Sequence, residues 1–461
     1  MLISDTHGNP VTASSRQSVE MLDRAVTAYL GFRKDTGDRL KEVFAVDPDL
    51  VLAHCLRGYF MMLFGQRAMV PRAQRSLEAA QKAAQAAGVS AREAAHLSAL
   101  AVWVAGDFAG ATASWDAIAA EHPRDLMALK LAQYGYFYAG ESKRMHRVLA
   151  RALPAWDPGM PDYGFVLGCH AFGLEEIGDY AAAERAGRDA IERNPADIWA
   201  AHAVAHVFEM AGRPREGVAW IGGLEGAWRD CNNFAYHALW HRCLFLIELG
   251  ARDHVLDLYD REVRPESTDD LLDISNAVSL LWRLEQEGVD VGDRWEELAV
   301  RSRAHIDDHL LMFGDIHYLL ALASAGRTED AARLVESLSR YAVESDESEA
   351  AVVREPGLTL ARAVLAYRRG DHSDAVELSA ARDKIWRIGG SHAQRDLFEE
   401  MLIDSALRAG ATEEARRLLA ERLERRPRNA WGWRHLAKAL DSLEDDAGAA
   451  GARRRAAQLV A

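Results

Sequence analysis

The chain has 461 residues, of which 49% are hydrophobic and only 12 are proline, and its formal net charge is −15 at pH 7. A chain of this length exceeds one compact core, so several domains or an elongated repeat array are expected. Abundant alanine and leucine with little proline favour an all-α protein. The acidic balance argues against nucleic acid or an anionic membrane as the main partner, because both select basic surfaces.

The sequence carries no signal for a membrane or for secretion. No run of about 18 apolar residues is present, so no transmembrane helix is predicted. The first five residues lack the charged and apolar regions of a secretory signal. The cysteines form no CxxC pair and are predicted to be reduced thiols; they are Cys55, Cys169, Cys231 and Cys243. We therefore expect a cytoplasmic protein.

Glycines recur at the ends of helix-like segments, at intervals of 34 to 44 residues. They are Gly31, Gly65, Gly106, Gly140, Gly178, Gly212, Gly250, Gly288, Gly326, Gly370 and Gly410. An interval of 34 is that of the tetratricopeptide repeat, a pair of antiparallel helices. Alanine follows several of these glycines by five residues and proline by seventeen, where two helices approach closely and where the second helix stops. The pattern predicts an all-α, tetratricopeptide-like superhelix (an α-solenoid) of about eleven helical hairpins.

We expect residues 15–461 to form a single superhelical domain and residues 1–14 a poorly ordered or loosely draped N-terminal arm. Residues 3–9 resemble the first motif of calcineurin-like metallophosphatases, but the strands that carry the other metal ligands of that fold do not follow, so no site is assigned there. The acidic stretch 344–349 is predicted to be a solvated loop.

Two consecutive hairpins carry histidine pairs with i, i+4 spacing on their first helices, His202 with His206 and His237 with His241. Residues four apart lie one turn above each other on the same helix face. The surrounding residues are mainly alanine, valine, leucine and aromatic side chains, so a face with stacked imidazoles indicates a function. These pairs are the clearest functional signal in the sequence.

The first helix of each tetratricopeptide hairpin lines the inner surface of the superhelix. His202, His206 and Glu209 stand 10, 6 and 3 residues before Gly212, which places them on one inward stripe. We expect this stripe to lie beside the second histidine pair. The candidate catalytic residues are His206, His241 and Glu209.

Further candidates for ligand binding come from neighbouring first helices. They are His170, Glu175, His202, His237, Asp315, His317, His392, Arg395 and Asp396. The last three follow a glycine pair and a capping serine at a helix start, where backbone donors and a cation favour an anionic group. We predict that they form one wall of a central pocket.

A lone histidine on an apolar helix is best explained as a buried imidazole bonded to nearby carbonyl groups, and His54 and His96 are assigned that role. For the larger set, imidazole and carboxylate groups supply either acid–base chemistry near neutral pH or ligands for a metal ion. The metal alternative requires at least three of them to converge, and the sequence identifies neither a metal nor another cofactor.

The chain resembles the tetratricopeptide repeat protein 38 family, the StaR-like group. The resemblance is carried by residues 202–206, 236–241, 315–317 and 390–396 and spans nearly the whole chain. It implies a helical superhelix of about this length and no established reaction. Some family members sit among genes for specialised metabolites, which implies a small-molecule role.

Two functions follow from the sequence. The first is binding of a small, anionic molecule in a pocket lined by histidine, aspartate and glutamate, with acid–base or metal-assisted catalysis left open. The alternative is a peptide- or protein-binding scaffold without enzymatic activity. Scaffold grooves usually use lysine, arginine and asparagine, so the inward histidines favour the first. Trp431 and Trp433 in the last repeat predict a homodimer.

Overall fold

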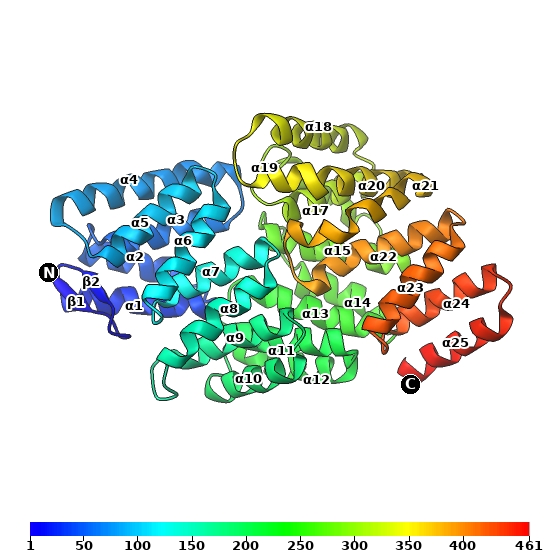
Figure 1. The fold of residues 1–461 in the computed structure, drawn as a ribbon, viewed down its shortest axis with the longest axis horizontal. Coiled ribbons are helices and arrows are strands. Elements are labelled where there is room, and N and C mark those ends of the chain that lie inside the picture. Colours follow the sequence, from blue (N-terminus) through cyan, green and yellow to red (C-terminus); the bar gives the residue numbers. More distant parts are fainter. Residues whose placement is uncertain (461) are drawn as a thin grey trace.

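The computed structural model describes residues 1–460 and, of Glu377, the backbone only. Its helices pack one after another as antiparallel hairpins (Figure 1). Those of the first half are α1 Arg16–Leu30, α2 Thr36–Val46, α3 Val51–Leu63, α4 Val70–Ala87, α5 Ala91–Val104, α6 Phe108–Glu121, α7 Leu126–Tyr138, α8 Ser142–Ala152, α9 Tyr163–Glu176, α10 Tyr180–Arg193, α11 Ile198–Ala211 and α12 Pro214–Leu224. Those of the second half are α13 Phe234–Glu248, α14 Arg252–Leu258, α15 Leu271–Gln286, α16 Arg294–Arg303, α17 Met312–Ser324, α18 Thr328–Glu344, α19 Glu349–Val352, α20 Leu358–Arg369, α21 His372–Ala375, α22 His392–Arg408, α23 Thr412–Arg425, α24 Ala430–Ser442 and α25 Asp446–Val460.

The prediction of an all-α, tetratricopeptide-like superhelix is confirmed. Each glycine of the repeat pattern lies between the two helices of a hairpin, and all except Gly31 have a φ between 62° and 92°, where a side chain would be strained. One more hairpin, α24 with α25, follows the last of these glycines. It turns at Glu444, whose φ is 59°, so the glycine pattern does not mark it.

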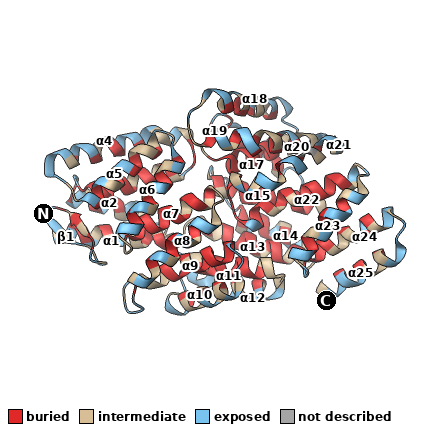
Figure 2. Cartoon of the chain, in the orientation of Figure 1, coloured by how far each residue is buried: buried red, intermediate tan, exposed pale blue. Residues whose placement is uncertain are grey.

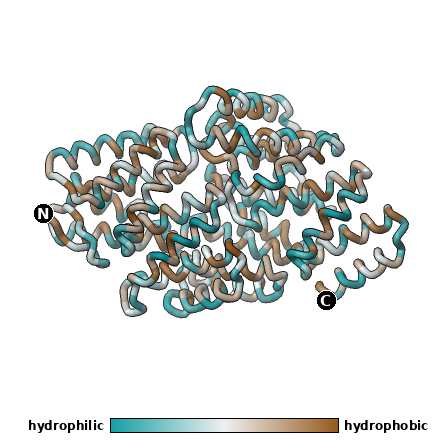
Figure 3. The backbone as a smooth tube through the Cα atoms, viewed as in Figure 1, coloured by the Kyte–Doolittle hydropathy of each residue, from teal (hydrophilic) through white to brown (hydrophobic). Residues whose placement is uncertain are grey.

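First and second helices differ in how they are buried. In α11 every residue from Ala200 to Phe208 is buried, whereas α10 buries only four positions along one stripe. The first helices α11, α13, α15, α17 and α22 are largely buried (Figure 2), and the outer helices alternate hydrophilic and hydrophobic residues along their length (Figure 3). A helix that is apolar all round belongs in the interior, and an amphipathic helix covers it. No helix in residues 1–460 combines the length and apolar character needed to cross a bilayer.

The N-terminal segment differs from the loosely draped arm expected from the sequence. Strands β1 (Leu2–Ser4) and β2 (Pro10–Thr12) form an antiparallel hairpin. The backbone and hydroxyl of Thr12 donate to the Glu93 carboxylate at 2.8 and 2.7 Å, and Val11 is fully buried. Three-residue strands have too little pattern to be recognised in a sequence, and the partner that fixes them lies on α5.

The acidic stretch 344–349 is also not the solvated loop that was expected. The Glu347 carboxylate accepts two hydrogen bonds from the Arg67 guanidinium, at 2.7 and 2.9 Å, and one from the Tyr341 hydroxyl at 2.8 Å. The backbone N–H of Ser348 donates to the Gly106 carbonyl at 3.1 Å. This connection therefore ties the second half of the chain to the first.

The C-terminal hairpins make a second contact across the superhelix. Arg426 pairs with Glu209 at 2.9 Å, Arg434 pairs with Glu287 at 2.7 Å, and the backbone N–H of Ala430 donates to a Glu248 carboxylate oxygen. Helix α22 contacts both α11 and α15. The superhelix thus closes on itself, so most of its inner face is packed rather than open to solvent.

The start of α7 depends on a buried carboxylate. Asp125 caps the helix by accepting from Ala128 N–H at 2.9 Å, pairs with Arg92 at 2.6 Å, and accepts from His96 Nε2–H at 3.0 Å. Although burial opposes it, the neighbouring His96 and Arg92 hold the pKa of this carboxyl well below its usual range. The result is an ion-paired cap in the interior.

Asp125→Ala should lower the free energy of unfolding by about 3–5 kcal/mol, because it leaves Arg92 and His96 buried without their partner. The matched control is Asp107→Ala, which removes a cap on α6 (Asp107 accepts from Gly110 N–H at 2.8 Å) at an exposed position. The control should cost about 1 kcal/mol. Urea unfolding of both variants measures the difference, and equal losses would contradict the buried-pair explanation.

Candidate functional site

A cavity of about 430 Å³ lies within the closed superhelix. It is formed mainly by first helices of the hairpins, namely α1, α3, α7, α11, α13, α15 and α22, together with the turns that adjoin them and the start of α2. The polar side chains in its wall include Lys130, Gln133, His202, His237, Asp270 and Gln394. It reaches the surface where the exposed residues Lys34, Gly37 and Phe64 line it.

Aromatic side chains are the largest group in the remaining wall. They are Tyr29, Phe32, Phe60, Phe64, Tyr134, Phe137, Tyr138, Trp199 and Phe234. Phe32 stacks between two of them, with ring centroids 4.2 Å from Phe234 and 5.6 Å from Trp199. Walls of this kind select flat apolar groups, because aromatic rings offer large surfaces with little conformational freedom to lose.

Helix α7 contributes the most unusual residue of the wall. The Lys130 ammonium lies 3.3 Å from the centroid of the Trp199 ring, and no carboxylate within the described residues forms an ion pair with it. Only 4% of Lys130 is exposed, and burial lowers the pKa of its amine to about 8. The Phe32 ring lies 5.1 Å from the ammonium as well, and the charge of the buried Asp197 carboxyl favours the charged amine from beyond ion-pair distance. A buried cation without a direct ion pair is costly unless another group pairs with it.

Two more polar atoms beside Lys130 lack a hydrogen-bond partner in the described part of the chain. The Gln133 amide donates to the Cys169 carbonyl at 2.7 Å, but its oxygen is unpaired, as is the indole N–H of Trp199. Lys130, Gln133 and Phe137 share one face of α7 by their i, i+3 and i+7 spacing. One end of an otherwise aromatic cavity is therefore polar.

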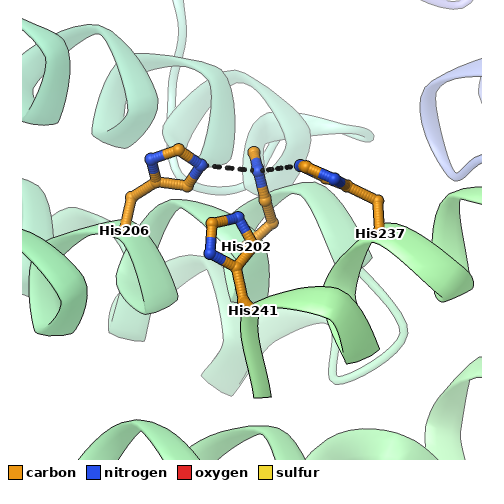
Figure 4. A group of neighbouring side chains, drawn as sticks. All are labelled: His202, His206, His237 and His241. Atoms are coloured by element: carbon orange, nitrogen blue, oxygen red, sulfur yellow. Dashed lines mark hydrogen bonds between the residues drawn. The ribbon is translucent and has the colours of Figure 1, made fainter. Parts of the chain in front are cut away.

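Four imidazoles meet where α11 and α13 pack together (Figure 4). His202 lies between two others: its Nε2 is 2.8 Å from Nε2 of His206 and 3.0 Å from Nε2 of His237. The His241 ring is 4.4 Å from that of His206 and 5.1 Å from that of His202, centroid to centroid. One nitrogen of each ring lies within 4.8 Å of one nitrogen of every other ring. We call these four residues the histidine cluster.

The histidine cluster is sealed from solvent, since no member is more than 3% exposed. Burial lowers the pKa of His237 to about 4, and burial together with the neighbouring imidazoles lowers the pKa of His202 and His241 well below the usual range. The cluster is therefore neutral near pH 7. Neutral imidazoles have a lone pair available for a proton or a metal ion.

Two contacts outside the histidine cluster orient its rings. Nδ1 of His237 is 2.9 Å from the side-chain oxygen of Asn276, and Nδ1 of His206 is 3.7 Å from a carboxyl oxygen of Glu175. Glu175 is buried, and neither of its carboxyl oxygens has a hydrogen-bond partner among the described residues. Burial, then the charge of Glu176, raises the pKa of Glu175 well above its usual range.

Two of the predicted site residues lie outside this site, in an ion-pair network. Glu209 pairs with Arg426 at 2.9 Å, and Asp396 pairs with Arg426 at 2.8 Å and with Arg422. Burial opposes it, but the two guanidinium groups hold the pKa of Asp396 well below its usual range. The Glu209 pair holds the C-terminal hairpins against α11, a contact between repeats that the sequence pattern does not reveal, whereas Asp396 pairs within its own hairpin.

The remaining inward residues are also paired locally. His170 stacks on His146 with ring centroids 5.6 Å apart, and Asp315 lies 3.2 Å from Nδ1 of His309. His317 donates from Nδ1 to a carbonyl of its own helix at 2.7 Å. The structure does not bring these three into the cavity or into the histidine cluster.

The start of α22 does not present a free cation. Arg395 donates to the carbonyl groups of Gly389 and Gly390, and His392 lies 3.7 Å from a Glu176 carboxyl oxygen. Arg395 is thus engaged by the backbone that precedes its own helix. The anion-binding wall predicted for His392, Arg395 and Asp396 is not part of the cavity, whose wall receives only Gln394 from α22.

The aromatic cavity and Lys130 were not predicted from the sequence. A signal was present, because Lys130 is the only charged residue in α7, whose sequence is LMALKLAQYGYFY. The aromatic lining comes from α1, α3, α7, α11 and α13, which are brought together only when the superhelix closes.

Comparisons with solved structures return helical repeat proteins at low sequence identity. No known family model matches the chain. The IFIT1 chain in the structure of the human IFIT1 dimer with m7Gppp-AAAA is 13% identical to this chain, with a TM-score of 0.38. The match covers 98% of this chain and 96% of the IFIT1 chain. A chain of the APC/C hetero-tetramer Cut9-Hcn1 is 12% identical, with a TM-score of 0.36, and the match covers 97% of this chain and 96% of that one. The P58(IPK) TPR domain is 16% identical, with a TM-score of 0.22, and the match covers 80% of this chain and 93% of that domain. At these scores nothing that those proteins bind is carried over to this chain.

Lys130→Met should stabilise the protein. The unfolded amine has a pKa near 10.4 and the folded one about 8, so between these values the unfolded state binds more protons and stability rises with pH. In the wild type the free energy of unfolding should rise by about 3 kcal/mol over this pH range. The variant should lack this rise, and at pH 7 it should melt a few degrees higher than the wild type. Calorimetry from pH 7 to 10.5 measures both effects.

The matched control is Lys34→Met, which replaces an exposed lysine of the cavity rim. It should leave the melting temperature and its pH dependence unchanged. A Lys130→Met variant that is less stable than the wild type at pH 7 would show that the amine is satisfied by its surroundings.

Proposed function

We propose that this protein binds a small, largely aromatic molecule with an acidic group in its central cavity. The observation that carries the proposal is Lys130, a buried ammonium beside two unpaired polar atoms in an aromatic wall. A carboxylate or similar anion at that end would neutralise the amine and accept from the Trp199 indole N–H. The aromatic side chains would enclose the rest of the ligand.

Size and access support the same proposal. A cavity of about 430 Å³ falls within the range of small-molecule sites. The exposed residues Lys34, Gly37 and Phe64 at its rim mark the side from which a ligand would enter. A peptide-binding scaffold, the alternative from the sequence, would use an open inner groove, and here the inner face is closed by Arg67 with Glu347 and by Arg426 with Glu209.

The proposal is one of binding rather than of a reaction. Catalysis by His206, His241 and Glu209 would require these side chains at the ligand, and none of the three is among the described residues that line the cavity. His202 and His237 do line it and are the members of the histidine cluster that a ligand could touch.

We also propose that the chain belongs to the tetratricopeptide repeat protein 38 family. The support is the set of motifs that carries the resemblance, two of which, 202–206 and 236–241, contain the whole histidine cluster. A shared function would then be a property of this cluster and of the cavity beside it.

Aromatic carboxylates and their neutral primary amides, tested as matched pairs, provide the experiment. The acid should quench tryptophan fluorescence and raise the melting temperature at pH 7, since it pairs with Lys130 and stacks near Trp199. Its affinity should exceed that of the amide about tenfold or more, as expected for a charge-assisted hydrogen bond. Isothermal titration gives both affinities.

Lys130→Met should abolish the preference for the acid, while Lys34→Met should keep it. Equal binding of acid and amide to the wild type would contradict the role of Lys130. Failure of every aromatic probe, together with tight binding of an extended peptide that Lys130→Met does not weaken, would favour the scaffold.

The homodimer stays a prediction of the sequence. Trp431, one of its two grounds, packs inside its own chain, stacked on His435 with centroids 3.9 Å apart and under the Arg422 guanidinium. Trp433 is partly exposed and donates to the Pro427 carbonyl at 3.0 Å. Light scattering at micromolar concentration should give twice the chain mass, and a monomer mass would contradict the prediction.

A further inference from the structure

The histidine cluster has more lone pairs than hydrogen bonds can use. The Nδ1–H of His237 donates to the oxygen of Asn276, so its Nε2 is an acceptor that points at His202. His206 also presents Nε2 to the same nitrogen of His202, at 2.8 Å. A neutral His202 has at most one proton on Nε2, which can satisfy one of these two contacts.

His241 adds to this imbalance. Neither of its ring nitrogens has a hydrogen-bond partner in the described part of the chain, although the side chain is fully buried. Its ring packs against the rings of His202, His206 and His237. Four buried imidazoles that face one another without enough protons for mutual hydrogen bonds are arranged as ligands around a common centre.

We propose that the histidine cluster is a metal site, in which His202, His206, His237 and His241 hold one divalent transition-metal ion of the zinc class. Two imidazoles from each of two adjacent helices would coordinate it, each through a ring nitrogen. The proposal does not rest on the proposed ligand of the cavity, since it uses only the geometry of α11 and α13.

The geometry fits a tetrahedral ion. Zinc–nitrogen bonds of about 2.0–2.1 Å separate ligand nitrogens by about 3.4 Å in a tetrahedron. The Nε2 atoms of His202, His206 and His237 are 2.8 and 3.0 Å apart in the two close contacts, and all four rings offer nitrogens within 4.8 Å. To reach about 3.4 Å, the two close separations would have to widen by about 0.4–0.6 Å and the widest would have to shorten by up to about 1.4 Å, which rotations of the four side chains can supply.

The ligand chemistry selects the class of metal. Four neutral imidazoles without a carboxylate suit zinc, copper, iron or nickel rather than calcium or magnesium, which prefer oxygen. Metal-bound histidines commonly donate their other N–H to a carbonyl or carboxylate that fixes the ring. Asn276 already accepts from His237, and a Glu175 oxygen lies 3.7 Å from Nδ1 of His206, close to where such an acceptor would stand.

The wild-type full-length protein provides the first test. After dialysis against metal-free buffer and addition of Zn²⁺, elemental analysis should find one tightly bound ion per chain. X-ray absorption of this sample should show four nitrogen ligands at about 2.0 Å with the scattering pattern of imidazole. Co²⁺ in place of Zn²⁺ should give the visible absorption of a tetrahedral nitrogen site.

Variants locate the ion. His206→Ala and His241→Ala each remove a ligand that does not line the cavity, and each should weaken Zn²⁺ binding by about 100-fold or more. Asn276→Ala keeps all four ligands but releases His237, and should weaken binding about 10–100-fold. His254→Ala, at an exposed position on α14, is the control and should not change binding.

The proposal fails if the wild type retains no ion, if the absorption data show oxygen or sulfur ligands, or if the histidine variants bind Zn²⁺ as tightly as the control. The wild-type measurements decide the question even if a cluster variant does not fold. If the metal proposal fails, the proposed ligand site in the cavity is unaffected, and the four histidines are neutral side chains that pack between α11 and α13. If the wild type binds Zn²⁺ as expected but shows no preference for the aromatic acid, the proposal for the cavity fails and the proposal for the metal site stands.

Discussion

The arrangement described above depends on closure of the superhelix upon itself. An open solenoid exposes its first helices along a groove, but here the bidentate pair of Arg67 with Glu347 and the pair of Arg426 with Glu209 join repeats that are more than 200 residues apart. Closure removes the inner face from water, which makes each unpaired polar group on it costly. Lys130 and the histidine cluster are therefore groups whose burial requires an explanation.

The cavity and the histidine cluster lie side by side and are built from the same two helices, α11 and α13. Helix α11 supplies Trp199 to the cavity and His202 to both the cavity and the cluster, and α13 supplies His237 to both. The cavity is aromatic with a cation at one end, whereas the cluster is neutral and rich in lone pairs. A ligand and a metal ion would therefore be held by neighbouring turns of the same two helices, with His202 and His237 between them.

Features that depend on local sequence spacing could be predicted from the sequence, but contacts between distant repeats could not. The glycine intervals identified the hairpins, and the i, i+4 pairs with their registration to Gly212 indicated that His202 and His206 face the second histidine pair, as they do. Glu209 had the predicted register, but its partner Arg426, at the end of α23, comes close only through closure. Asp396 instead pairs with Arg422 and Arg426 of the helix that follows its own. The aromatic wall was invisible for the same reason, because five separate helices contribute to it.

The central claim is that the closed inner face encloses a site for a small acidic aromatic molecule next to the histidine cluster. A crystal structure of the wild-type protein grown with an aromatic carboxylate tests it most directly. Ligand density should be stacked near Trp199, with an oxygen within hydrogen-bond distance of the Lys130 amine. Density found only on the outer helices, with the cavity filled by side chains or by water, would contradict it.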